Sequence, residues 1–147
     1  MNRRALLAAP ALMTIGASAA AADLSPKALV LAFYKLALDD REPEKAFARY
    51  ASDDFVDYSP DVPGGSLKEA AAFLRGLMTR MPQGRWTIVR SAAEGDLVFL
   101  HVRFLPAPGA PEIAIAEIFR VSGGKIVEHW DVLRDAPEKP VNSHPMV

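Results

Sequence analysis

The sequence contains no cysteine, which excludes a disulfide, a thiolate zinc site, a cysteine nucleophile and an acylated lipoprotein cysteine. It has no apolar run of the roughly 20 residues that a bilayer-spanning helix needs, so we expect no stable membrane anchor. It also lacks a Gly-x-Ser-x-Gly motif, a phosphate-binding loop and a dinucleotide-binding fingerprint. These absences argue against the common active-site architectures of hydrolases, nucleotidases and dehydrogenases.

The sequence also has no large excess of positive or negative charge. The chain has 17 basic and 18 acidic residues, for a formal net charge of −1. Loss of residues 1–22 would remove two arginines, leaving 15 basic against 18 acidic residues and a charge of −3. Such a chain offers no basic field, so we expect neither nucleic acid nor an anionic membrane as a partner.

Residues 1–22 have the three-part pattern of a cleavable export signal. Arg3 and Arg4 give a positive start, residues 5–16 form an apolar run, and small residues lead to a cleavage site after Ala22. The alternative is a buried first helix. Either the general or the twin-arginine export route would suit, although the arginine pair lacks the flanking residues usual in a twin-arginine signal. We expect one mature domain, residues 23–147, that is periplasmic or secreted.

Capping and proline signals predict three helices in the first half of this domain. Ser25 followed by Pro26 starts a helix that runs to about Asp39, and Pro43 starts a second, short one. Ser66 and Glu69 have the spacing of a capping box, which predicts a third helix to about residue 81.

From Trp86 onward the apolar residues alternate with a period of two, which predicts strands at residues 86–92, 97–105, 112–121 and 125–133. Short glycine-containing loops between them favour antiparallel hairpins. Helices followed by an antiparallel meander predict an α+β fold, with the helices on one face of a curved sheet. The proline-rich tail after Ala136 is expected to be irregular.

The last hairpin carries the most promising cluster of ionisable residues: Glu117, His129 and Asp131. A three-residue loop at residues 122–124 would place Glu117 opposite His129, with Asp131 two residues farther along on the same face. A two-residue Gly123-Gly124 loop would instead pair Glu117 with Trp130 and separate the cluster. The sequence leaves both registers open.

Two interpretations fit this cluster. In one, the groups line a pocket where a carboxylate base removes a proton next to a carbonyl, or activates water, and the imidazole polarises the oxyanion. In the other, a His–carboxylate hydrogen bond only holds the strand in place. The His129-x-Asp131 spacing also occurs in iron facial triads, but the second histidine would have to be His101 or His144, and we expect no metal.

Four further residues are candidates for substrate binding. Asp57 and Tyr58 precede Ser59-Pro60 and could close a pocket from the helical side, or could lie in a solvated turn. His101 lies on a strand face with Phe99 and Arg103, where a structural role is the alternative. Trp130 could contact a ligand or pack in the core.

Four strings suggest a family. They are Gly95-Asp96-Leu97-Val98, Ile118-Phe119-Arg120-Val121, the string from Gly124 to Val132 that reads Gly-Lys-Ile-Val-Glu-His-Trp-Asp-Val, and Asn142-Ser143-His144-Pro145-Met146. With this order of elements, the chain resembles the SnoaL-like proteins of the nuclear transport factor 2-like superfamily, in the branch named for predicted aldol-condensation enzymes.

The resemblance implies a cone of three helices and a curved sheet around a ligand pocket, often in a homodimer through the outer face of the sheet. It also implies a pocket aspartate, matched by Asp131, that acts as acid and base without a cofactor. Relatives commonly carry Gln-His-Asn-Pro where this chain has the residues 57–60, and a strand aspartate where it has Glu117. The fold hosts both enzymes and binding proteins, so it does not by itself choose a reaction.

We therefore expect a cofactor-free acid/base enzyme acting on a small hydrophobic carbonyl or hydroxyl compound: an aldol-type cyclase, isomerase, dehydratase or hydrolase. Asp131, His129 and Glu117 are the expected catalytic residues. One alternative is a periplasmic protein that binds a small apolar ligand without turnover, and another is an accessory dimer whose pocket is filled by side chains. Export argues against polyketide ring closure, which takes place beside a cytoplasmic synthase.

Overall fold

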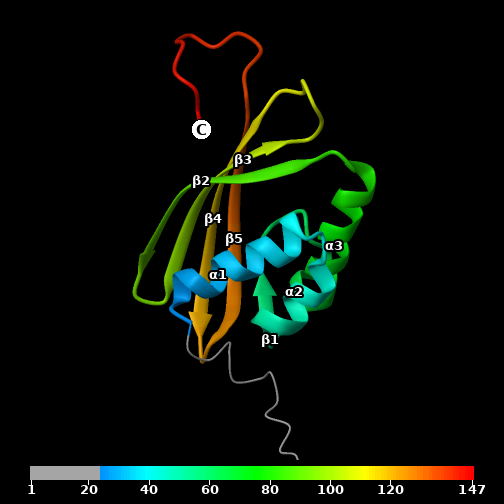
Figure 1. Ribbon diagram of the computed structural model, residues 1–147, viewed down its shortest axis with the longest axis vertical. Coiled ribbons are helices and arrows are strands. Elements are labelled where there is room, and N and C mark those ends of the chain that lie inside the picture. Colours follow the sequence, from blue (N-terminus) through cyan, green and yellow to red (C-terminus); the bar gives the residue numbers. More distant parts are fainter. Residues whose placement is uncertain (1–23) are drawn as a thin grey trace, which may run out of the picture.

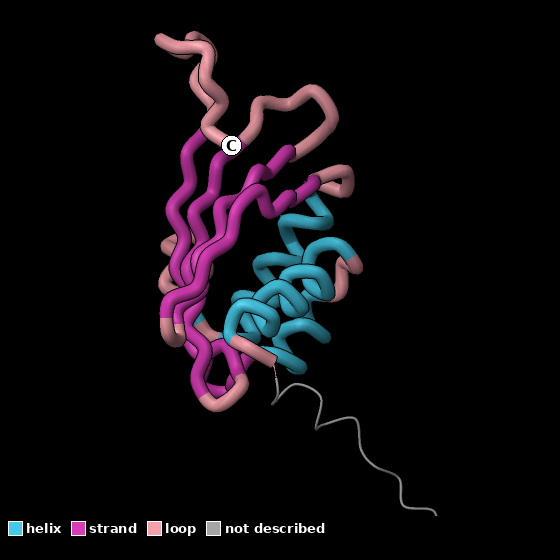
Figure 2. The backbone as a smooth tube through the Cα atoms, turned by 60° about the vertical axis from the view of Figure 1, so that its left-hand side comes forward, coloured by secondary structure: helices cyan, strands magenta, loops and turns pink. Residues whose placement is uncertain are grey.

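In a computed structural model of the protein, three helices lie against the concave face of a five-stranded curved sheet (Figures 1 and 2). The structure describes residues 24–147. The predicted export signal and its cleavage site lie outside this range. No helix within the range is long and apolar enough to cross a membrane. The predicted α+β architecture is confirmed.

The three predicted helices are present, and the local signals explain where they begin. They are α1 (Pro26–Tyr34), α2 (Pro43–Tyr50) and α3 (Leu67–Arg80). At the start of α1 the Ser25 side chain accepts a hydrogen bond from the Ala28 amide, and α3 begins with a complete capping box of Ser66 and Glu69. A π-helical turn, Lys35–Asp39, extends α1 to its predicted end.

The sheet contains one strand that the sequence did not reveal. The strands are β1 (Ala51–Asp57), β2 (Arg85–Glu94), β3 (Leu97–Leu105), β4 (Ile113–Ser122) and β5 (Lys125–Asp135), in the order β1-β5-β4-β3-β2. The four-stranded antiparallel meander β2–β5 was predicted. The unpredicted β1 adds to its edge in parallel with β5. Ser52, Asp53 and Asp54 have low strand propensity, so this strand depends on its partner rather than on its own sequence.

The register of the last hairpin differs from both predicted registers. The turn pairs Ser122 with Lys125, which fits the two-residue loop, but a bulge then leaves Val127 without a partner on β4. Beyond the bulge, Glu117 lies opposite Asp131, and Phe119 lies opposite His129. Because the extra residue changes the alternation, the cluster still shares one face of the sheet. The expected pairings of Glu117 with His129 or Trp130 are therefore wrong, whereas the expected convergence is confirmed.

The concave face of the sheet and the inward faces of the helices form the core. Val98, Leu100 and Val102 of β3 are buried, while the residues between them point outward. Phe33 of α1 packs edge-on against Phe47 and Phe119, at centroid distances of 5.0 and 6.0 Å. The core occupies only part of the space between the layers, and the remainder is a cavity.

Candidate active site

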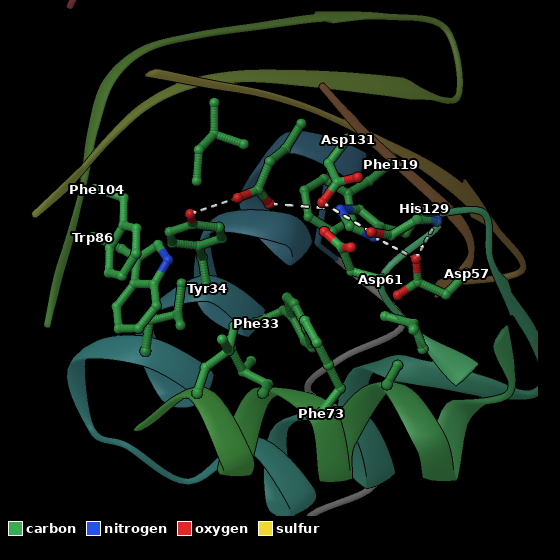
Figure 3. A pocket seen from close by; sticks show the side chains of 18 of the residues that line it. Phe33, Tyr34, Asp57, Asp61, Phe73, Trp86, Phe104, Phe119, His129 and Asp131 are labelled. Carbon is green, nitrogen blue, oxygen red and sulfur yellow. Dashed lines mark hydrogen bonds and ion pairs between the residues drawn. The ribbon is translucent and has the colours of Figure 1, made fainter. Parts of the chain in front are cut away.

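A cavity of about 320 Å³ lies between the helices and the concave face of the sheet (Figure 3). Its wall is mostly apolar, with residues from all three helices and from β1 to β5. The polar side chains on the wall are Tyr34, Asp57, Ser59, Asp61, Glu117, His129 and Asp131. An apolar cavity with a few convergent polar groups is the usual form of a small-molecule site.

His129 lies between two carboxylates. Its Nδ1 is 3.1 Å from Asp57 Oδ1, and its Nε2 is 3.7 Å from Glu117 Oε2, while the side chain is only 14% exposed. Burial disfavours the charged ring, but the interactions with Asp57 and Glu117 outweigh burial and raise the pKa of His129 from 6.5 to about 10. At neutral pH the ring is therefore an imidazolium.

Tyr34 of α1 holds Glu117 from the opposite side of the cavity. Its hydroxyl donates a hydrogen bond of 2.9 Å to Glu117 Oε1. Burial and the neighbouring Glu117 carboxylate raise the pKa of Tyr34 well above its ordinary value, so the phenol remains a donor. One Glu117 oxygen thus accepts a hydrogen bond from the neutral Tyr34 hydroxyl, and the other faces the His129 imidazolium.

Asp131 is connected to the same network through Ser59. The Ser59 amide donates to Asp57 Oδ1 at 2.9 Å, and the Ser59 hydroxyl donates to Asp131 Oδ2 at 3.2 Å. Within residues 24–147, the buried Oδ1 of Asp131 has no hydrogen-bond partner. Burial raises the pKa of Asp131, with smaller contributions from Glu117 and Asp57, although the charge of His129 and the Ser59 hydrogen bond oppose the rise. Asp131 therefore holds a proton more readily than an ordinary aspartate.

The end of β1 positions this network. Parallel pairing places Asp57 beside His129, and the Tyr58 amide donates to the His129 carbonyl at 2.8 Å. The following loop passes close to the strand: a Cβ at Gly65, where φ is +66°, would lie 2.5 Å from the Asp57 carbonyl oxygen. Glycine is therefore required there for close packing as well as for its backbone conformation.

Four of the seven predicted site residues meet in the cavity: Glu117, His129, Asp131 and Asp57. The other three, Tyr58, His101 and Trp130, do not line it. Strand alternation puts His101 and Trp130 one residue from an inward side chain and so on the outer face, and Tyr58, which directly follows β1, lies beside Trp130. There, Tyr58 stacks on Trp130 at a centroid distance of 5.0 Å, and His101 Nδ1 is 3.0 Å from an Arg90 nitrogen.

Three polar residues of the wall, Tyr34, Ser59 and Asp61, were missed by sequence reasoning. Tyr34 could have been noticed as a hydroxyl on a helix whose neighbouring residues are apolar. Ser59 and Asp61 lie in a turn-rich segment that gives no signal of burial. Neither of the histidines that an iron facial triad would need, His101 or His144, lines the cavity. Within residues 24–147, no group of three or more His, Asp and Glu side chains is arranged to hold a metal ion.

Solved structures with the same architecture confirm the fold. IdmH from Streptomyces antibioticus, a candidate polyketide cyclase, is 18% identical with a TM-score of 0.63, over 75% of this chain and 92% of that one. An NTF2-like (nuclear transport factor 2-like) protein from Cytophaga hutchinsonii is 17% identical with a TM-score of 0.62, over 76% and 92% of the two chains. A candidate SnoaL-like isomerase from Agrobacterium tumefaciens is 13% identical with a TM-score of 0.62, over 76% and 99%. At such identities the likeness establishes the fold alone.

Sequence comparison supplies the family. No curated protein matches the chain. The SnoaL-like domain matches residues 30–129, a segment that includes most of the helices and the strands that form the cavity. The predicted resemblance is therefore confirmed, and the chain belongs to the SnoaL-like domain family.

Proposed function

We propose that the protein is a cofactor-free acid/base enzyme that acts on a small hydrophobic carbonyl or hydroxyl compound, with Asp131 as the group that transfers the proton. The observation that carries the proposal is the Asp131 carboxyl on the wall of an apolar cavity, with a raised pKa and a buried oxygen that has no partner among the described residues. A general acid/base works best when its pKa lies near the working pH. The likeness to candidate cyclases and isomerases supports the same class of reaction.

In the proposed first step, the Asp131 carboxylate removes a proton from carbon next to a carbonyl. The electron pair of the C–H bond moves to the carbonyl oxygen, which becomes an enolate. The His129 imidazolium lies beside Asp131, and its Nε2–H has no hydrogen-bond partner within residues 24–147, so it can stabilise that oxygen. If a C=C bond extends the enolate, return of the proton from Asp131 at the far carbon gives an isomer. Attack of the enolate carbon on a second carbonyl gives an alkoxide, and transfer of the Asp131 proton to that alkoxide completes the aldol product and restores the carboxylate.

Glu117, expected from the sequence to be catalytic, acts in this proposal as a positioning residue. Together with Asp57 it keeps His129 charged, while Tyr34 fixes the direction of the Glu117 carboxylate. A neutral histidine would be a much weaker electrostatic partner for an enolate. The two buried carboxylates therefore supply the charge state on which the proposed step depends.

The proposed step can be measured before the natural substrate is identified. Small cyclic ketones and β-diketones are incubated with the protein in D₂O, and deuterium incorporation next to the carbonyl is followed by NMR. We expect exchange above the buffer rate for at least one compound and a fall of about 100-fold or more in Asp131→Asn. Asp53→Asn changes an exposed aspartate of β1 in the same way and should keep the wild-type rate. Equal exchange by wild type and Asp131→Asn would refute the proposed role.

A non-catalytic binding protein is the second candidate, favoured by the mostly apolar wall and by the burial of the two key atoms, His129 Nε2 and Asp131 Oδ1. Native mass spectrometry of the purified protein separates the two functions. An intact small ligand that is retained, and that is returned unchanged after incubation, supports binding. Conversion of that ligand supports the enzyme.

We also propose that the mature domain is exported and forms a homodimer through the outer face of its sheet. The pattern of residues 1–22 supports export. Exposed apolar side chains on the outer face support the dimer, among them Val132 at 68% and Phe99 at 37% exposure. Mass spectrometry that finds, in a periplasmic fraction, a chain beginning at Asp23 would confirm export. Sedimentation should show a dimer that Val132→Asp converts to a monomer, and unchanged sedimentation of the variant would contradict this interface.

A further inference from the structure

The cavity wall carries more acidic than basic side chains. Four carboxyl groups reach the wall, from Asp57, Asp61, Glu117 and Asp131, and His129 is the one basic residue among the described residues that line it. No Lys or Arg of residues 24–147 belongs to the wall. Even with Asp131 protonated, an excess of two negative charges remains. An anion entering this space would lose its hydration and find only one cation, which two carboxylates already hold.

The internal pairing leaves one of these carboxyl groups, that of Asp131, incompletely satisfied. His129 is shared by Asp57 and Glu117, and Tyr34 donates to Glu117. Asp131 keeps a buried oxygen without a partner within residues 24–147. Asp61 lines the cavity but is solvent-exposed, so water can solvate its carboxylate. In Figure 3 both side chains point toward the polar part of the cavity. The buried Asp131 oxygen needs a hydrogen-bond donor that the described residues do not supply.

The rest of the cavity suits the body of the ligand. Trp86 and Phe104 stack at a centroid distance of 4.3 Å and line the cavity together with Phe73 and Leu77. This wall can bury a flat or extended hydrocarbon skeleton but can satisfy few polar groups. The volume of about 320 Å³ is at the small end of the range for drug-sized ligands.

We propose that the cavity selects hydrophobic molecules by charge: it accepts uncharged and cationic molecules, rejects anions, and binds a basic nitrogen most tightly by pairing it with Asp131 and Asp61. An ammonium group offers three donors and no acceptor, which suits the unpartnered Asp131 oxygen and the solvent-exposed Asp61 carboxylate on the same wall. The inference deepens the proposed function. It means that the substrate reaches the site as a free molecule without a carboxylate, phosphate or phosphate-bearing carrier.

The fluorescence of Trp86 alone can report ligand binding. The sequence has two tryptophans, so Trp130→Phe leaves the cavity tryptophan as the one indole reporter. This variant is titrated at pH 7.5 with 4-phenylbutylamine, 4-phenylbutan-1-ol and 4-phenylbutanoate, which share a skeleton and differ in the charge of the head group. We expect the amine to bind more tightly than the alcohol. The carboxylate should bind at least about tenfold more weakly than the alcohol, because it adds a like charge to a partly desolvated acidic site.

Substitution of Asp61 and Asp131 tests the assignment to these residues. Asp61→Asn with Asp131→Asn, in the Trp130→Phe background, should abolish the preference for the amine over the alcohol. Asp53→Asn in the same background is the matched control and should retain it. Circular dichroism and the Trp86 spectrum establish that each variant is folded. A preference that survives the double substitution would overturn the assignment to Asp61 and Asp131.

The outcomes separate this inference from the proposed function. Tightest binding of the carboxylate, or no binding by any of the three compounds, would overturn charge selection whatever the deuterium exchange shows. Exchange that is insensitive to Asp131→Asn, together with the order amine, alcohol, carboxylate, would instead refute the catalytic role and leave charge selection standing. The titration reads equilibrium binding without turnover, so the two results are independent.

Discussion

The charge of His129 should make the stability of the protein depend on pH in the alkaline range. The pKa of this ring rises from 6.5 in the unfolded chain to about 10 in the folded protein. Because the folded pKa is the higher one, the stabilisation is fully present below pH 6.5 and is lost as the pH rises through about 10. Each pKa unit corresponds to about 1.4 kcal/mol, so the full effect is about 5 kcal/mol. About 3 kcal/mol of it should disappear between pH 7 and pH 9.5.

Urea unfolding at pH 7 and pH 9.5 measures this loss. The free energy of unfolding of the wild type should fall by about 3 kcal/mol more than that of His129→Gln, which lacks the titrating ring. His101→Gln changes a histidine outside the cavity and should retain the wild-type dependence. His129→Gln itself should lose about 3–5 kcal/mol at pH 7, since Asp57 and Glu117 would be buried without their cation.

NMR of the histidine rings in the wild type reads the charge state of His129 directly, without the need for His129→Gln to fold. The His129 ring should show imidazolium chemical shifts throughout pH 6–8.5, and Asp57→Asn should lower its pKa because the partner at Nδ1 loses its charge. A wild-type His129 that titrates with a midpoint at or below 7 would refute the reasoning, as would equal pH dependence of the wild type and His129→Gln.

Two further substitutions test how the network is held. Tyr34→Phe removes the donor to Glu117 and should lower the free energy of unfolding by about 1–3 kcal/mol. Tyr50→Phe removes a hydroxyl with no hydrogen bond within residues 24–147 and should change it by less than about 0.5 kcal/mol, so equal losses would contradict the Tyr34 interaction. Gly65→Ala adds a clash to backbone strain, so it should lower the thermal stability of the protein more than Gly95→Ala does. At Gly95 φ is +60° but nothing lies within 4 Å of an added Cβ. Equal losses in the two variants would show that the close approach at Gly65 is unimportant.

Local signals were sufficient for most of the fold. Ser25 and the Ser66–Glu69 capping box mark helix starts by satisfying amides of the first turn, which is a short-range effect. The strands β3 and β4 alternate with a period of two because one face of the sheet is buried and the other is not. β1 has no such pattern, and its formation depends on hydrogen bonds to β5, about 75 residues later in the chain.

The site was predictable only in part for the same reason. Glu117, His129 and Asp131 lie on neighbouring strands, so the sequence could bring them near one another, but the register depended on a bulge at Val127 that no local signal marks. Tyr58, His101 and Trp130 have the chemistry of site residues. Their direction was decided by the pleat of the sheet rather than by residue type.

The sequence by itself determined the absence of cysteine chemistry, the helix starts, the antiparallel meander, the α+β class, the family resemblance and the three ionisable residues of the last hairpin. Only the tertiary structure decided that Asp57 meets His129 and that Tyr34 reaches Glu117 across 83 residues of sequence. The tertiary structure also decided that these groups share one apolar cavity. The physical reason is that capping and alternation act over a few residues, whereas burial and charge pairing depend on distances that arise only when the layers pack.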